Sequence, residues 1–242
     1  PYSQNKLIAK GEQRTFNGGY LFLQRIYHEL KLDKICQNIS ERHKFSFDLD
    51  EILSRLLYAR ILFPASKLAT LKLSHNFLQP PTFELQHIYR ALEVIAKESD
   101  FIQSEVYKNS RSIQKRNAGI LYYDCTNYFF EIEQESGLKQ YGYSKEHRPN
   151  PIVQMGLFID SDGIPLAFDI NAGNTNEQVT LRPLEQKILK DFDDGIDATA
   201  FSDAVKAKKA GVKQFIFMST MKVYPSPTLF HPIEVTTNTP PA

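Results

Sequence analysis

The chain has 242 residues, with 29 Lys and Arg against 28 Asp and Glu, so its formal net charge is +1. This balance excludes a strongly basic nucleic-acid coat and an acidic tail at the level of whole-chain totals. Apolar residues make up 42% of the chain and charged residues 24%, which is ordinary globular composition. Cys36 and Cys125 are far apart and fit no metal spacing, so we expect neither a disulfide nor a zinc site. Without a secretory signal or an apolar run of ~18 residues, we expect a cytoplasmic protein with no membrane partner.

The first segment, residues 1–116, shows helical periodicity from about Asn17 onward. Asp48 and Glu51 form a capping pair before an apolar run that ends at Pro64. We predict four or five packed helices in this segment, which could also bind DNA. Its last part carries four basic residues and no acidic one, and these could contact phosphates: Lys108, Arg111, Lys115 and Arg116.

From Gly119 the pattern becomes that of β-strands. Residues 120–131 are apolar and aromatic, and apolar residues also dominate 151–160 and 164–170. The turn signal Ser161–Gly163 predicts that the second and third strands pair antiparallel. A helix is expected to start near Thr180. Residues 117–193 therefore predict a mixed sheet with one helix.

The remaining residues differ again in style. Ala198–Ala210 is rich in Ala and Lys and predicts a helix, which a short buried strand follows at 215–218. Residues 194–224 therefore form a predicted αβ unit suited to a parallel sheet. Residues 225–242 contain five Pro and predict an irregular tail. The predicted fold class is α+β.

Asp124 is the strongest candidate for a chemical role. An unpaired carboxylate inside an apolar strand is costly to bury. A divalent metal used in phosphoryl chemistry is one explanation, and a hydrogen bond from Thr126 near a strand end is the simpler one. Spacing does not choose a second acid among four candidates, of which two fall in the hairpin turn, one is expected to face solvent and one lies beyond the helix: Asp160, Asp162, Asp169 and Asp203.

The loop at 141–150 carries a second group of candidates. Lys145, His147 and Arg148 stand there with two tyrosines and could contact phosphates and bases. The alternative is a solvated connection between two strands. The chain shows no Ser/His/Asp order, no HExxH motif and no P-loop.

An ordered series of segments resembles the transposases of bacterial insertion sequences in the broad IS4-like group. The resemblance extends from about Gly119 to Phe192, and the helical segment before it is similar to the family's N-terminal part. The segments are Tyr122–Phe129, Gly142–Pro149, Met155–Leu157, Gly163–Leu166 and Ala172–Glu177. The resemblance implies a DDE enzyme of DNA transposition and recombination with an RNase H-like catalytic domain, here incomplete.

The resemblance also implies site residues, a cofactor and partners. Asp124 would be the first acid, binding Mg²⁺ or Mn²⁺ and activating water or a 3′-hydroxyl for attack on a DNA phosphodiester. Asp203 is the closest match to the second acid and metal ligand, although Val205 stands where the family has Gly. The third acid, a Glu on a later helix, has no match. The implied partner is DNA, bound by a homo-oligomer.

Residues 204–224 instead resemble the extended short-chain dehydrogenase/epimerase family, with Thr220 at the position of its catalytic Ser or Thr. That family's Gly-rich dinucleotide motif is absent. We therefore expect a C-terminally truncated transposase frame fused to an epimerase fragment, with the join between about Asp191 and Asp203. Missing strands would leave open sheet edges, free to pair with the epimerase strand.

Such a chain is expected to be a transposase by descent with little or no activity. The alternatives are a DNA-binding remnant without catalysis, a less supported NAD-dependent epimerase-like protein, and a structural protein without a site.

Overall fold

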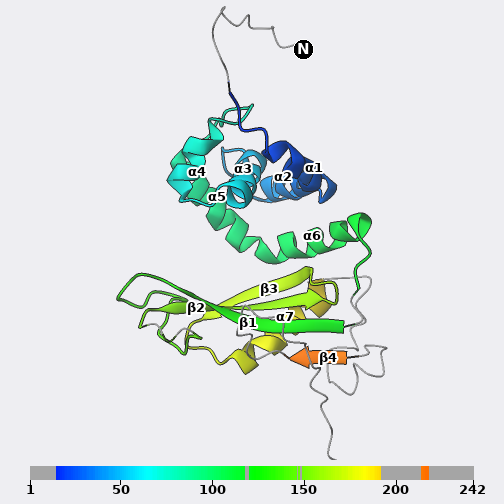
Figure 1. The fold of residues 1–242 in the computed structure, drawn as a ribbon, viewed down its shortest axis with the longest axis vertical. Helices are drawn as coiled ribbons and strands as arrows, with labels where there is room; N and C mark the ends of the chain where they lie inside the picture. Colours follow the sequence, from blue (N-terminus) through cyan, green and yellow to red (C-terminus); the bar gives the residue numbers. More distant parts are fainter. Residues whose placement is uncertain (1–14, 118–119, 146, 148, 192–213, 218–242) are drawn as a thin grey trace, which may run out of the picture.

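The computed structural model describes residues 15–117, 120–145, 147, 149–191 and 214–217. These residues form an α+β structure, with a group of helices on one side and a mixed sheet on the other (Figure 1). The first six helices are α1 (Tyr20–Glu29), α2 (Leu32–Arg42), α3 (Leu49–Leu62), α4 (Lys67–Ser74), α5 (Leu85–Lys97) and α6 (Ser99–Ile113). After them come β1 (Ile120–Phe129), β2 (Ile152–Asp160), β3 (Pro165–Ala172), α7 (Glu177–Asp191) and β4 (Gln214–Phe217).

The helical region has more breaks than its periodicity predicted, so residues 15–117 contain six helices and not four or five. Lys31 has a φ of 54° in the left-handed region, which a right-handed helix cannot continue, and it separates α1 from α2. The predicted capping pair is confirmed, because the Asp48 side chain accepts the backbone N–H of Glu51 at 3.0 Å where α3 begins.

Helices α1 to α5 share one hydrophobic core. Ile39, Ile52 and Phe77 are completely buried in it. Tyr20 stacks on Phe77 with ring centroids 4.5 Å apart. Helix α6 also contributes to this core, through the partly buried Val106 and its neighbours.

The sheet has the strand order β3-β2-β1-β4. Strands β1, β2 and β3 pair antiparallel, and β4 pairs parallel with the first four residues of β1, Ile120–Tyr123. The predictions of an antiparallel hairpin at Ser161–Gly163 and of a parallel strand near 215–218 are both confirmed. Strand β4 therefore pairs with the side of β1 that β2 does not occupy.

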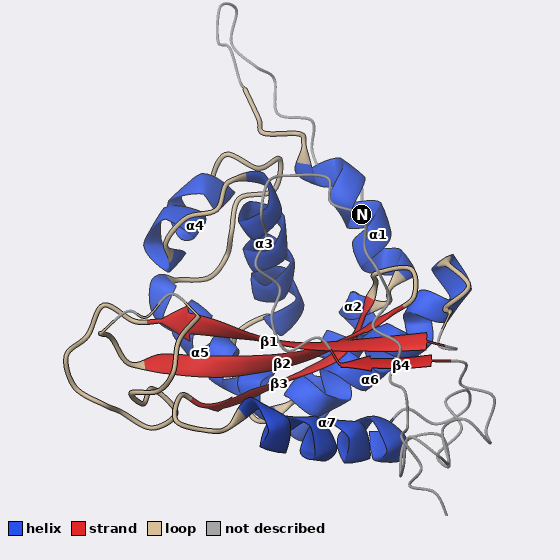
Figure 2. Cartoon of the chain, turned by 60° about the horizontal axis from the view of Figure 1, so that its bottom comes forward, coloured by secondary structure: helices blue, strands red, loops and turns tan. Residues whose placement is uncertain are grey.

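A second hydrophobic core lies between the sheet and α7, which runs along one face of the sheet (Figure 2). Tyr123 and Phe158 point to this face, where they pack with Leu184 and Ile188 of α7. Tyr107 of α6 is also part of this core. Helix α6 therefore contacts both cores and joins the helical region to the sheet.

The outer edge of β3 is covered by α6. The side-chain oxygen of Gln103 accepts the backbone N–H of Phe168 at 2.7 Å. Lys187 of α7 donates to the carbonyl oxygen of Phe168 at 3.3 Å and pairs with Asp100 of α6. These contacts occupy hydrogen-bonding groups that an open edge strand would offer to another chain.

Cys36 and Cys125 are buried free thiols. No helix in the described ranges has the length and apolar character needed to cross a membrane. The helix predicted at 198–210, the tail at 225–242 and the greater part of the predicted join lie outside the described residues.

Candidate functional site

Asp124 lies in β1 between Tyr123 and Cys125, both buried in the core beneath α7. Because side chains alternate along a strand, Asp124 points to the opposite face of the sheet. Its side chain is 31% exposed. The described part of β4 pairs with β1 as far as Tyr123, the residue before Asp124.

Lys145 brings the loop between β1 and β2 onto this part of the strand. Its ammonium nitrogen lies 3.4 Å from Asp124 Oδ1 and also donates to the carbonyl oxygen of Cys125. Its backbone N–H donates to Asn127 Oδ1 at 3.2 Å. The loop is therefore tied to this part of β1, and it places a cation beside Asp124.

The partner of the Asp124 carboxylate is thus Lys145, not Thr126 as the simpler explanation had it. The Lys145 side chain is 25% exposed, so the ion pair is reached by solvent. A partly exposed pair of this kind contributes little stability, on the order of 0.2–1 kcal/mol. An anion that displaces Asp124 from Lys145 therefore has to offset only the small stabilisation that this ion pair contributes.

The other described acids do not join Asp124. Asp160 is completely buried, and its Oδ1 accepts the backbone N–H groups of Asp162 and Ile164 at 3.1 and 2.9 Å. Asp169, which we expected to face solvent, is partly exposed. The strand register places both Asp160 and Asp169 on the α7 face, opposite to Asp124. Asp203 lies outside the described residues.

This donor set does not fit a metal centre. The described residues contain no cluster of three or more His, Cys, Asp or Glu side chains that could hold a metal ion. Asp124 offers a single carboxylate, and its ionic partner is a lysine. Mg²⁺ or Mn²⁺ held as a catalytic pair needs several oxygen ligands around the two ions. The described part of the chain therefore does not form such a site by itself.

The predicted basic residues fall into two groups that the structure keeps apart. Lys108 and Arg111 lie exposed on the last turns of α6, and Lys115 is exposed just after it. Lys108 pairs with Glu105 at 3.1 Å. This end of α6 lies near the start of β1, whereas the loop between β1 and β2 extends beyond the other end of the sheet (Figure 1).

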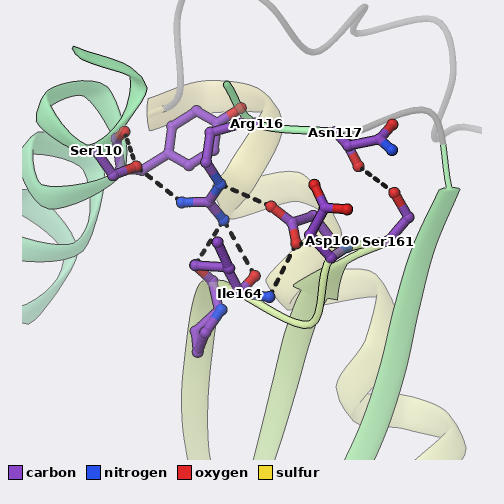
Figure 3. Close-up of polar contacts among 9 residues, drawn as sticks. Ser110, Arg116, Asn117, Asp160, Ser161 and Ile164 are labelled. Atoms are coloured by element: carbon purple, nitrogen blue, oxygen red, sulfur yellow. Dashed lines mark hydrogen bonds and ion pairs between the residues drawn. The ribbon is translucent and has the colours of Figure 1, made fainter. Parts of the chain in front are cut away.

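Arg116 is a structural residue. Its Nε donates to Asp160 Oδ2 at 2.7 Å and its Nη1 to Ser110 Oγ at 2.8 Å (Figure 3). Its Nη2 donates to the carbonyl oxygens of Ile164 and Pro165. The side chain is only 4% exposed, so phosphate cannot reach its guanidinium without unfolding this junction. The predicted phosphate contact of Arg116 therefore does not fit its buried position.

His147 lies on the exposed part of the loop. Its φ is 53°, and its backbone N–H donates to the Ser144 carbonyl oxygen at 3.0 Å. The rings of His147 and Tyr143 pack edge-on with their centroids 5.3 Å apart, and Tyr143 is 73% exposed. These two rings are open to a ligand, whereas Arg148 lies outside the described residues.

Sequence reasoning gave Asn127 no role. Its Oδ1 accepts the backbone N–H of Lys145, while its Nδ2 is buried and has no hydrogen-bond partner among the described residues. Asn127 is opposite Gln154 in the register, and Gln154 is opposite Asn171, so three amide side chains form a row across the sheet. The available signal was an amide at a position where the alternation of β1 favours an apolar residue.

No protein-family model matches this chain, and the searches found no curated protein and no solved structure that matches it.

Proposed function

We propose that this protein is a DDE-type transposase by descent, with an incomplete RNase H-like domain, and that its working activity is DNA binding with little or no strand cleavage. The observation that best supports descent from a transposase is the position of Asp124. It lies within β1 of a mixed sheet, partly exposed on the face away from α7. That position supports the role of first acid that the sequence resemblance implies.

DNA binding follows from the cations around this sheet. Lys145 stands next to Asp124 in a partly exposed ion pair, and a phosphate oxygen can replace the carboxylate as its partner. His147 and Tyr143 extend the same loop with exposed rings. Lys108, Arg111 and Lys115 form a second basic group at the end of α6. Contacts of this kind neutralise phosphates and make affinity depend on salt.

Low cleavage activity is expected because the described residues bring too few carboxylates to the site. A bound divalent metal would supply charge stabilisation at the scissile phosphate in a DDE enzyme. The described residues bring one carboxylate to the site, and a lysine pairs with it. No cleavage step can be derived from that arrangement.

The test of DNA binding is fluorescence anisotropy at several salt concentrations, without divalent metal. Lys145→Gln is expected to weaken binding and to reduce the salt slope by about one phosphate contact. Lys34→Gln removes an exposed lysine of α2 and is the matched control, for which we expect little change. Equal effects of the two substitutions would remove Lys145 from the binding surface.

The test of cleavage is Mn²⁺-dependent nicking of DNA that carries the element's own ends, with Asp124→Ala as control. We expect no nicking by either protein. Nicking that disappears in Asp124→Ala would contradict this expectation, and Asp203 would then be the first residue to test as a second metal ligand. Light scattering of the protein–DNA complex would show whether it assembles as the implied homo-oligomer.

The NAD-linked alternative gains no support. Its case depended on residues 203–224, of which 214–217 form β4 in the same sheet as Asp124. Thr220 lies outside the described residues.

A further inference from the structure

A groove opens in the helical region, between α5 and the segment that joins α2 to α3. Its volume is about 790 Å³, which is within the range of cavities that bind small ligands. The six lining residues that matter for binding are Lys44, Phe45 and Phe47 from the segment, and Arg90, Glu93 and Lys97 from α5. None of them belongs to the basic groups discussed above.

The groove is basic. Arg90 and Lys97 are seven residues apart and so lie on one face of α5, and Lys44 faces them from the joining segment. All three cations are exposed, and no described residue forms an ion pair with any of them. Glu93 is the single carboxylate of the lining.

Glu98, the residue that follows α5, already has two partners. Its carboxylate pairs with Arg42 at 3.0 Å and contacts His43, a residue of the groove lining, at 2.7 Å. The groove therefore presents three unpaired cations against one carboxylate, an excess that favours an anionic ligand.

The groove also presents an aromatic stack. Phe45 and Phe47 are almost parallel, with ring centroids 4.4 Å apart and an interplanar angle of 7°. Phe47 stacks in turn on His87 at 6.0 Å. Phe47 thus stacks on two rings and Phe45 on one. Both phenylalanines are partly buried against the helical core, and both line the groove.

We propose that this groove binds single-stranded DNA, with an unpaired base stacked on Phe45 and the neighbouring phosphates held by Lys44, Arg90 and Lys97. Cations that follow the backbone and rings that stack on bases are together the features of single-strand binding sites. A base pair inside a duplex cannot stack on Phe45 without opening. The choice of DNA as the nucleic acid rests on the proposed function.

The test uses the full chain and a short, labelled, single-stranded DNA of mixed sequence, followed by fluorescence anisotropy. The variant Lys44→Gln/Arg90→Gln/Lys97→Gln neutralises the groove. The variant Lys34→Gln/Arg60→Gln/Lys72→Gln removes the same number of Lys and Arg charges from exposed positions outside it. We expect the first to lower the salt slope by about 2, since each single-strand phosphate contact contributes about 0.7. The second should leave the slope unchanged.

The aromatic contribution is tested separately. Phe45→Leu removes the ring but keeps an apolar side chain, and Phe45→Tyr keeps the ring. We expect Phe45→Leu to weaken single-strand binding about tenfold, as loss of one base–aromatic contact does, and Phe45→Tyr to bind like the original protein. Circular dichroism of each variant shows whether the helices remain folded.

Two further measurements complete the test. A duplex of the same sequence should bind more weakly and should not respond to Phe45→Leu, and inorganic phosphate should compete only at high concentration. The proposal that the groove binds single-stranded DNA is contradicted if both triple variants lose affinity equally. It is also contradicted if Phe45→Leu binds single strands as well as Phe45→Tyr does. Binding that needs Lys145 but not the groove would overturn this inference alone, whereas absence of any DNA binding would also overturn the proposed function.

Discussion

Arg116 and Asp160 form a buried ion pair at the junction of the helical region and the sheet, with their side chains 4% and 0% exposed (Figure 3). Asp160 also accepts two backbone N–H groups of the turn between β2 and β3. Arg116 binds two carbonyl groups of the same hairpin and Ser110 of α6. This pair therefore fixes the end of α6 to the hairpin.

Removing one partner should be strongly destabilising. Asp160→Ala leaves the Arg116 guanidinium buried without its carboxylate, and we expect a loss of about 3–5 kcal/mol in the free energy of unfolding. Urea denaturation at neutral pH measures it. Asp162→Ala, at an exposed position of the same turn, is the control and should cost less than about 0.5 kcal/mol. Similar losses in both variants would show that the pair does not hold this junction.

Gly156 is required by the close approach of Tyr123. A Cβ at Gly156 would overlap Tyr123 Oη and lie 3.0 Å from Tyr123 Cζ. Tyr123 Oη is also held in place by a hydrogen bond of 2.5 Å with Thr180 Oγ1 of α7. Gly156→Ala should therefore destabilise the fold by about 1–3 kcal/mol. The cost should shrink in a Tyr123→Phe background, where the overlapping oxygen is gone. Additive effects of the two substitutions would contradict this geometry.

Both thiols should be unreactive in the folded protein. Cys36 is 1% exposed and Cys125 is 3% exposed, and burial raises the pKa of the Cys36 thiol to about 12. The reactive form of cysteine is the thiolate, so a disulfide reagent at pH 8 should label neither residue until the chain unfolds. Labelling of one thiol under native conditions would show that its core is open.

The free energy of unfolding should decrease as the pH rises, because Asp50 titrates. Burial, with the charges of Asp48 and Asp33, raises the pKa of this carboxyl, although the Tyr27 hydroxyl donates to it at 2.6 Å. The folded protein thus holds the proton more tightly than the unfolded chain, whose Asp has a pKa of about 3.9. The stabilisation is complete below that value and is lost as pH rises through the folded pKa.

The matched variant for this effect is Asp50→Asn, which does not titrate. Relative to Asp50→Asn, the original protein should lose unfolding free energy between acidic and neutral pH, as urea titrations at each pH would show. If the unfolding free energy of the original protein relative to Asp50→Asn stayed constant or increased as the pH rises, burial would not be the main influence on the pKa of Asp50.

The local parts of the fold could be predicted because their signals are local. The turn at Ser161–Gly163 fixed the antiparallel hairpin, and the capping pair at Asp48 fixed the start of α3. The break at Lys31 was missed because a left-handed Lys carries no sequence signal of the kind that Gly gives.

The sites were harder to predict because their partners are distant in sequence. Arg116 stood in a run of basic residues that suggested phosphate contacts, yet its carboxylate partner is 44 residues away. Asp124 was identified as unusual by its apolar neighbours alone, but its pairing with Lys145 depends on how the loop returns to β1. The groove could not be predicted for the same reason, since Phe45 and Arg90 come to line one groove only in the folded chain.

The most direct test of the proposed function is the DNA affinity of Asp124→Asn without divalent metal. The account predicts tighter binding than in the original protein, by up to about fivefold, because Lys145 loses its carboxylate partner and becomes available to phosphate. The gain should vanish in Asp124→Asn/Lys145→Gln. Unchanged or weaker binding by Asp124→Asn would contradict the claim that Asp124 and Lys145 form part of a DNA-binding surface.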